Sequence, residues 1–597
     1  MDLFDILTFV GGLAFFMFGM NQLSAGLETM VGGRFEQLLA KMTSNRLKAL
    51  GLGALVTALV QSSSAITVMV VGLVNSGIMN LTQSVGVIMG SNIGTTITAW
   101  ILSLVGIESG NVFIKLLKPD SFAPVVALVG IILLMFFKTS KKKNLGTVLI
   151  GFAVLIYGMS IMGDAVSGLQ DVPEFGQLMV AFSNPIAGIL AGAIITAVIQ
   201  SSSASVGILQ SLSLTGAIPF ASALPIIMGQ NIGTCVTALI SSVGTTKNAK
   251  RVTAVHIYFN VLGTLICLPL FLILSNTFNF SFVNEDATPV MIAVAHTIFN
   301  IVTTILLFPL GKFLQKLAEK TVKDKNGAIT KETMLDDRLL ISPGFAIVES
   351  RNSTIKMAEI TKENIIRALT LIGNYDKRIV SQVEDAEGEI DMYEDKIGAY
   401  LIKINQQQLT GKDNTDISQL LQTIGDLERI SDHAVNITEV ANEIYEKGLK
   451  FSDKAMAEID VMIKAVEEIL ELSISSFTDN NNDRATYVEP LEEVVDGLKT
   501  ELRNRHIKRL QEGKCTIELG FVLSDLITNL ERVSDHCSNI AISQLEANLD
   551  TQIEAHDYVE RIKERGEFNY NQKFDTFLYK YRLPKSVSSS NTNYQPD

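Results

Sequence analysis

The chain has 597 residues, of which 47% are hydrophobic and 19% are charged. This composition is too apolar for an ordinary soluble protein, and the length calls for more than one domain. The net charge of −13 argues against a nucleic-acid partner. Four scattered cysteines form no C-x-x-C pair, so we expect neither a disulfide framework nor a thiolate zinc site.

The charged residues divide the chain into two parts. Residues 1–320 hold 16 Lys and Arg and 12 Asp and Glu, whereas residues 321–597 hold 33 and 50. The first part is apolar sequence broken by short polar loops, and the second has the 3.6-residue periodicity of helices. We therefore expect a membrane domain over 1–312, a linker over 313–342 with a turn at Asn326-Gly327, a soluble helical domain over 343–550, and a tail over 551–597 that is partly disordered.

Long apolar stretches fill the first part. Most approach or exceed the ~20 residues that a helix needs to cross a bilayer. So many stretches with so few charges exclude the core of a soluble protein and predict an all-α polytopic membrane domain. The stretches are 4–22, 49–75, 81–105, 122–137, 145–163, 186–212, 218–244, 252–274 and 290–311.

Basic residues predict the orientation of this domain, because Lys and Arg concentrate in cytoplasmic loops. The loops at 164–174 and 275–289 contain acids but no Lys or Arg, and we place them outside the cell. The basic segments, which we place in the cytoplasm, are Arg34–Lys48, Lys138–Lys143, Lys247–Arg251 and Lys312–Lys323.

An internal repeat runs through the apolar part. Val60-Gln-Ser-Ser-Ser-Ala65 recurs 139 residues later as Ile199-Gln-Ser-Ser-Ser-Ala204, and Gly90-Ser-Asn-Ile-Gly-Thr95 recurs at the same offset as Gly229-Gln-Asn-Ile-Gly-Thr234. The duplicated units cover about 10–105 and 149–244. The charge pattern gives the two units opposite orientations, and inverted repeats are typical of secondary transporters with a midplane binding site.

This orientation requires each Gln-Ser-Ser-Ser segment to enter and leave on one side, as a re-entrant hairpin. About 12 apolar residues precede each run, enough for a half-helix of ~18 Å that ends near the membrane midplane. A second half-helix would begin there, with free N–H groups able to bind an anion. The alternative, serines that only hydrogen-bond their own helix, is less consistent with two symmetric copies.

The Asn-Ile-Gly-Thr stretches predict broken helices whose carbonyl groups coordinate an ion. Close helix packing through small residues is the alternative. A further short repeat, His256-x-x-Phe-Asn260 and His296-x-x-Phe-Asn300, is interpreted as polar contacts between the last helices, with ion binding as the alternative.

Together, the paired QSSSA and N-I-G-T motifs over about 10–311 resemble the type II sodium/phosphate cotransporter family. The resemblance implies sodium-coupled import of inorganic phosphate across the cell (inner) membrane. Ser91 and Thr96 are replaced by Gln230 and Cys235 in the second copy, so equivalent positions need not bind the same ion. The implied phosphate-binding residues are Gln61, Ser62, Ser63, Ser64, Gln200, Ser201, Ser202 and Ser203, and the implied sodium-binding residues are Gln61, Ser64, Asn92, Thr95, Gln200, Ser203, Asn231 and Thr234.

The soluble part repeats as well. The segment Asp426–His433, D-L-E-R-I-S-D-H, recurs as Asn529–His536. Glu and Asp four residues apart share one helix face, and we interpret the face around Glu428 as pointing toward the apolar stripe that includes Leu421. Carboxylates in such a place need a cation, and a metal with hard oxygen ligands is the natural partner. Pairing with the adjacent Arg429 and Arg532, or plain exposure to solvent, are the alternatives.

This signature over about 340–550 resembles PhoU-like domains. The resemblance implies a pair of three-helix bundles in the cytoplasm, a role in phosphate regulation, and clusters of divalent or iron-type metals. The implied metal ligands are Glu387, Asp391, Glu428, Asp432, Glu492, Asp496, Glu531 and Asp535.

The expected partners are therefore inorganic phosphate, sodium and membrane lipids, with no nucleic acid, and a homodimer is left open. The chain has no G-x-S-x-G elbow and no G-x-x-x-x-G-K-[ST] loop, which argues against a hydrolase or an ATPase. A membrane-bound phosphate sensor without transport activity is the other alternative. Two intact QSSSA hairpins favour the transporter.

Overall fold

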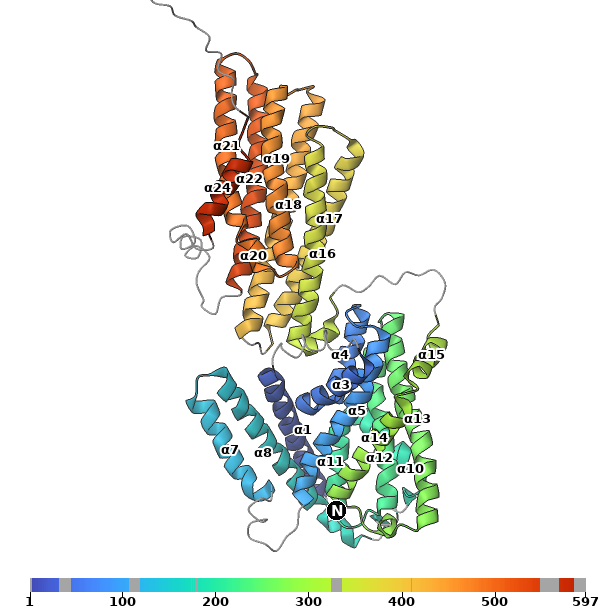
Figure 1. Ribbon diagram of the computed structural model, residues 1–597. Coiled ribbons are helices and arrows are strands. Elements are labelled where there is room, and N and C mark those ends of the chain that lie inside the picture. Colours follow the sequence, from blue (N-terminus) through green and yellow to red (C-terminus); the bar gives the residue numbers. More distant parts are fainter. Residues whose placement is uncertain are drawn as a thin grey trace, which may run out of the picture. The chain divides into compact units, whose positions relative to one another are not determined.

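Figure 1 shows the computed structural model of the chain, which separates into two compact units. The membrane unit comprises 1–346 with 408–410, and the soluble unit comprises 347–407 and 411–597. The structure describes residues 3–31, 45–106, 119–172, 174, 175, 177, 181–323, 335–407, 409, 411–547 and 569–584. The predicted turn at Asn326-Gly327 and most of the basic segment Arg34–Lys48 lie outside these ranges.

The membrane unit is helical where it is described, and each predicted apolar stretch is a helix or a pair of helices. Six helices are long and apolar enough to cross a membrane, and their spans are Leu3–Met30, Leu81–Ser103, Lys141–Leu169, Phe220–Ser241, Lys247–Phe278 and Pro289–Leu307. The helices are α1 (Leu3–Val31), α3 (Arg46–Val60), α4 (Ser63–Asn75), α5 (Leu81–Ser103), α7 (Pro119–Phe136), α8 (Ser140–Val166), α10 (Pro185–Ile199), α11 (Ser202–Ser213), α12 (Phe220–Ser241), α13 (Lys247–Phe278) and α14 (Pro289–Leu307).

Helices α1 and α8 open the two repeats, and they pack against each other in antiparallel directions. Gly12 of α1 lies against Gly158 of α8, and Gly19 lies against Gly151. A Cβ atom built on Gly19 would lie 2.3 Å from the backbone nitrogen of Leu155, so only glycine allows this approach. Gly12 and Gly19 are the counterparts of Gly151 and Gly158 at the 139-residue offset. The contact therefore pairs equivalent residues crosswise, as a two-fold relation between the repeats requires.

The predicted linker is partly structured. Helix α15 (Gly311–Thr321) covers its first residues, and the short 3-10 helix η4 (Asp337–Ile341) lies at its end. Leu339 of η4 is fully buried, so this end of the linker packs as part of the membrane unit.

The soluble unit consists of long, nearly parallel helices, as Figure 1 shows. These helices form two three-helix bundles, which are joined by the turn between Glu446 and Asp453. The bundles are α16 (Pro343–Thr370), α17 (Lys377–Asn405) and α18 (Gly411–Glu446), then α19 (Asp453–Thr478), α21 (Val488–Gln511) and α22 (Ile517–Glu546), with the short α20 (Asn482–Ala485) between them. The predicted pair of bundles is confirmed.

Part of the predicted tail forms a helix. Helix α24 (Tyr570–Lys580) packs on the second bundle. The Lys580 ammonium group lies 2.7 Å from both carboxylate oxygens of Glu468, and Arg505 donates a hydrogen bond of 2.7 Å to the Pro584 carbonyl. The polar composition of residues 551–597 gave no sign of this helix, whose apolar and aromatic side chains, such as Phe577, are buried.

Candidate functional site

The first Gln-Ser-Ser-Ser run lies where the chain reverses direction. Helices α3 and α5 are parallel, because Arg46 lies beside Gly86 and Leu50 beside Gly90. A Cβ atom at Gly90 would lie 2.0 Å from the Leu50 carbonyl oxygen, so the two backbones touch. Since α5 starts beside the start of α3, the chain must return along α4. Helices α3 and α4 thus form a hairpin with the serines at its tip.

The second run has the same geometry. Helices α10 and α12 are parallel, with Ile189 beside Gly229 and Ala193 beside Gly233. The chain returns between them along α11. That each hairpin enters and leaves the membrane on the same side stays a prediction, but the reversal of the chain that this needs is present in each repeat.

A glutamine in an unusual conformation makes each reversal. Gln61 and Gln200 both have a φ of 59°, in the left-handed region that few non-glycine residues adopt. Their backbone N–H groups still donate to Thr57 and Thr196, at 2.8 and 2.7 Å, and so close the last turn of α3 and of α10. The glutamine therefore ends one helix and turns the chain toward the next.

The serine that follows each glutamine starts the returning helix. The hydroxyl oxygen of Ser62 accepts a hydrogen bond from the Ala65 amide, and that of Ser201 accepts one from the Ala204 amide, both at 3.2 Å. Serine is among the best N-cap residues for this reason. The other first-turn amides of α4 and α11 have no partner within their own helix and are available to an anion.

The two tips meet. The hydroxyl groups of Ser63 and Ser202 lie 3.4 Å apart, and the Ser64 hydroxyl lies 3.5 Å from the Gln200 carbonyl oxygen. Ser63 and Ser202 are equivalent at the 139-residue offset, so the contact pairs corresponding residues of the two repeats. Two helix N-termini, each equivalent to about half a positive charge, therefore converge on one point.

The two tips are not identical in their surroundings. The buried Gln61 side chain accepts a hydrogen bond of 2.8 Å from Thr98 and donates to the Ala58 carbonyl. Its counterpart Gln200 is exposed. Thr237, which corresponds to Thr98, has a buried hydroxyl with no hydrogen-bond partner among the described residues. Only the first glutamine is thus held against its neighbouring helix.

The prediction of broken helices at the Asn-Ile-Gly-Thr stretches is wrong. Helices α5 and α12 continue through them without interruption. The glycines serve close packing instead: a Cβ atom at Gly94 or at Gly233 would lie 2.5 Å from the carbonyl oxygen of Ala54 or Ala193. The small residues bring α5 against α3 and α12 against α10. This is the close helix packing that the alternative interpretation expected.

The predicted sodium-binding side chains on these helices are buried and hydrogen-bonded. Asn92 donates to the Ile88 carbonyl at 2.9 Å, and Thr95 and Thr234 each donate to the carbonyl four residues earlier at 3.0 Å. A threonine that donates to its own helix keeps oxygen lone pairs for a cation. The sodium assignment for these residues remains a prediction.

Asn231 lies in a buried polar cluster that includes the second histidine motif. Its side-chain nitrogen donates to Asn300 at 3.1 Å, and its oxygen lies 3.3 Å from His296 Nε2. Asn260 donates to the Cys235 sulfur at 3.3 Å. The His-x-x-Phe-Asn repeat thus connects α13 and α14 to α12, which agrees with polar packing contacts.

Gln230 occupies the position of Ser91 in the other repeat, but the two side chains make different contacts. Its side-chain nitrogen donates to the Ser205 carbonyl at 3.0 Å and so connects α12 to the returning arm α11. Ser91, at the equivalent place, instead accepts a hydrogen bond of 2.9 Å from Thr57 in α3. Nothing in the sequence indicated that Gln230 would contact Ser205, or that Thr57 would contact Ser91.

In the soluble unit, the first set of predicted metal ligands forms a partly exposed carboxylate group between α17 and α18. Burial is the main cause that raises the pKa of Glu387, and Asp391 and Asp432 raise it further. The pKa of Glu428 is raised by burial and then by Asp432. The four carboxylates are therefore close enough to repel one another. The predicted inward orientation of Glu428 is only partly right: Ile424 on the same face is buried, but Leu421 is 40% exposed.

In the second set of predicted metal ligands, basic side chains pair with the carboxylates. Lys499 of α21 lies 3.0 Å from a carboxylate oxygen of Glu531, and Arg532 lies 3.4 Å from Asp535. Lys499 occupies the position of Glu394 in the first repeat at the 105-residue offset. Pairing with a basic residue, the alternative to metal binding, is thus observed here. Across the described residues no three His, Cys, Asp or Glu side chains are arranged to hold a metal ion.

The histidines of the two D/N-L-E-R-x-S-D-H segments brace α18 against α22. His433 Nδ1 lies 2.8 Å from the side-chain oxygen of Asn529, and His536 Nδ1 lies 2.9 Å from Asp426. Each histidine thus contacts the opposite repeat. Burial is the main cause that lowers the pKa of His433.

Two hairpins that meet tip to tip in a bundle of apolar helices define a membrane transport domain, joined here to a soluble helical domain. The sequence matches the Na+/Pi-cotransporter family over residues 15–164 and 170–283, and the PhoU domain over 354–441 and 459–543. The chain belongs to the Na+/Pi-cotransporter family, is a phosphate transporter rather than an enzyme, and carries a PhoU domain.

Three relatives illustrate the range of the family. The uncharacterized protein YqeW of Bacillus subtilis is 30% identical over 54% of this chain and 99% of its own length. The putative inorganic phosphate export protein YjbB of Salmonella typhimurium is 22% identical over 91% of this chain and 97% of its own. The sodium-dependent phosphate transport protein 2A of Rattus norvegicus is 44% identical over 15% of both chains.

Proposed function

We propose that the chain couples the movement of inorganic phosphate to that of sodium and imports phosphate across the cell membrane. The observation that carries the proposal is the meeting of two helix N-termini at Ser63 and Ser202. Hydroxyl groups and first-turn amides there can donate to phosphate oxygens. In this proposal both repeats contribute donors to one anion site.

The need for sodium follows from the charge of the site. The sequence has no Asp, Glu, Lys or Arg between residues 61 and 105 or between 185 and 246. Two helix ends supply about one positive charge, too little for the dianionic form of phosphate in a low-dielectric place. Sodium ions bound by hydroxyl and carbonyl oxygens would supply the rest. In this proposal the ions use Gln61, Ser64, Asn92 and Thr95 in one repeat and Gln200, Ser203, Asn231 and Thr234 in the other.

Export is the second candidate, because YjbB, a putative export protein, matches almost the whole chain. An inward sodium gradient drives a symporter toward import, whereas export needs a different driving force. Purified protein in liposomes decides between them. Radiolabelled phosphate should enter liposomes when sodium is high outside, and the rate should fall to background without the gradient. Export predicts flux that follows the phosphate gradient regardless of sodium.

We further infer that the first carboxylate group of the PhoU domain binds a metal cation in the cytoplasm. Its carboxylates repel one another, with raised pKa values at Glu387 and Glu428, and a divalent or iron-type ion is the kind of cation that such oxygen ligands bind. A bound cation would neutralise the group and join α17 to α18. The second group fits less well, because Lys499 already supplies a positive charge.

A further inference from the structure

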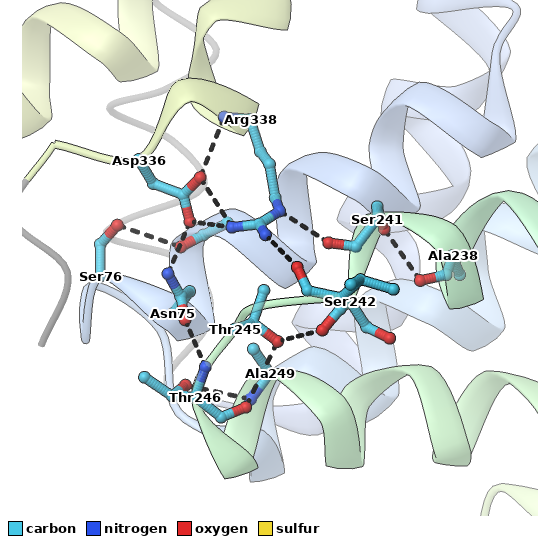
Figure 2. A network of polar contacts seen from close by, with 12 residues as sticks. Asn75, Ser76, Ala238, Ser241, Ser242, Thr245, Thr246, Ala249, Asp336 and Arg338 are labelled. Carbon is cyan, nitrogen blue, oxygen red and sulfur yellow. Dashed lines mark hydrogen bonds and ion pairs between the residues drawn. The ribbon is translucent and has the colours of Figure 1, made fainter. Parts of the chain in front are cut away.

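An ion pair between Asp336 and Arg338 lies at the end of the linker, and hydrogen bonds of both residues attach this end to the helices of the membrane unit. The Asp336 carboxylate accepts two hydrogen bonds of 3.0 Å from the Arg338 guanidinium, and the Asp336 side chain is only 2% exposed. Figure 2 shows this pair between two segments that are far apart in the sequence. A buried ion pair is held in place strongly, since removing one partner leaves the other charge uncompensated.

One side of the contact is the base of the first hairpin. Asn75, the last residue of α4, donates a hydrogen bond of 2.7 Å to Asp336. A Cβ atom on Gly72, one turn earlier, would lie 2.9 Å from Leu339 Cδ2 and 3.5 Å from Arg338 Cβ. The linker therefore packs directly against the returning arm of the hairpin.

The other side is the connection that leaves the second repeat. Arg338 donates to the Ser241 carbonyl at 2.6 Å and to the Val243 carbonyl at 2.8 Å, where α12 ends. The side-chain oxygen of Asn75 accepts a hydrogen bond of 2.7 Å from the Thr246 amide at the start of α13. Asp336 and Arg338 thus bridge the first hairpin and the end of the second repeat (Figure 2).

We propose that Asp336 and Arg338 form a latch that holds the first hairpin in one state of the transport cycle and must release for the hairpin to move. The proposal rests on the proposed transport function, because alternating access requires one repeat to move relative to the other. A bridge between the two repeats stabilises only the arrangement in which its atoms meet.

The position of the latch in the chain connects it to the PhoU domain. Only Ser342 separates η4, which contains Arg338, from α16, the first helix of the soluble bundles. Among the described residues the hairpin of the second repeat has no comparable arrangement: the connection that follows it is held by backbone hydrogen bonds, from the Ala287 amide to the Ile218 carbonyl at 2.7 Å and from the Phe220 amide to the Glu285 carbonyl at 2.9 Å. The latch is therefore continuous in the chain with the soluble domain and hydrogen-bonded to the first hairpin, whereas the second hairpin has no such connection in the part of the chain that the structure describes.

A reversible cross-link tests the release. The 3.5 Å between a Cβ atom at position 72 and Arg338 Cβ suits a disulfide, and only the end of the Leu339 side chain must shift. Gly72→Cys with Arg338→Cys should lose phosphate flux about tenfold or more on oxidation and recover it on reduction. Each single variant is the control and should ignore the oxidant. A cross-linked protein that transports at its reduced rate overturns the latch.

A second measurement does not depend on transport. Hydrogen exchange of residues 63–75 in the full chain should become faster in Arg338→Ala, because the base of the hairpin loses its restraint. Arg251→Ala is the matched control: Arg251 also donates to a backbone carbonyl, that of Val322, at 3.1 and 3.2 Å. Unchanged exchange in Arg338→Ala overturns the latch. A native protein that moves no phosphate would instead count against the proposed function.

Discussion

The hydroxyl of Ser63 lies 3.4 Å from that of Ser202, although 139 residues separate them in the chain. Each residue follows the N-cap serine of a helix, and each belongs to a different repeat. The phosphate site proposed here is therefore shared, and it exists only while the two hairpin tips remain together.

Removing either hydroxyl should weaken phosphate binding. A hydrogen bond to a charged ligand contributes about 1.5–3 kcal/mol, so Ser63→Ala or Ser202→Ala should each reduce phosphate affinity roughly 10- to 150-fold. Isothermal titration of the purified protein with phosphate in sodium buffer measures this. Ser213→Ala is the control, because the Ser213 hydroxyl only donates to the Gln210 carbonyl of its own helix. Equal losses in all three variants would contradict the assignment.

Sodium should control the affinity of the same site. With no charged side chain on either hairpin tip, phosphate binding should fall steeply when choline replaces sodium at constant ionic strength. Potassium serves as the control for a general salt effect. Phosphate affinity that is the same in sodium and in choline would show that the helix ends suffice without a co-bound cation.

The sequence predicted the helices, the repeats and the hairpins better than it predicted the details around them. Apolar stretches and a fixed offset locate helices reliably, and paired Gln-Ser-Ser-Ser runs located the tips. Gly94 and Gly233 were misread as helix breaks, because a glycine that permits close packing and one that ends a helix look alike in sequence. The contact of Arg338 with the Ser241 carbonyl depends on tertiary structure and left no local signal.

Exchanging a glutamate and a lysine at equivalent positions should change how much metal each of the two carboxylate groups of the PhoU domain binds. Glu394→Lys introduces into the first group the residue type found at Lys499, and it should reduce the metal retained by the purified protein. Lys499→Glu should allow the second group to bind additional metal. Elemental analysis after dialysis against each candidate metal provides the measurement. The inference fails if Glu394→Lys retains as much metal as the native chain.

The stability of the metal-free protein should decrease as the pH rises above the ordinary carboxyl range. Burial and neighbouring carboxylates raise the folded-state pKa of Glu387 and Glu428 above 4.5, so the folded state binds more protons than the unfolded state in that window. In chelator, Glu428→Gln should flatten the fall in unfolding temperature between about pH 4.5 and 7. Glu512, whose pKa is lowered by Lys514, is the control of opposite sign, because its contribution is lost as the pH falls. An unchanged slope in Glu428→Gln would contradict this account.

The predicted inversion of the two repeats leads to an expectation about membrane topology. Single cysteines at Gly168, Lys142 and Lys450 can be labelled with an impermeant maleimide in intact cells. We expect Gly168→Cys to react from outside, and the other two to react only after the membrane is opened. External labelling at Lys450 would place the PhoU domain outside the cell and would contradict the predicted topology.

The central claim is that sodium drives phosphate through a site shared by Ser63 and Ser202, and flux into liposomes tests it most directly. Protein in liposomes should accumulate radiolabelled phosphate when an inward sodium gradient is imposed. Accumulation should disappear when choline replaces sodium and in the variant that combines Ser63→Ala with Ser202→Ala. Sodium-driven accumulation that persists in the double variant, or phosphate flux that is equal in choline, would contradict the account.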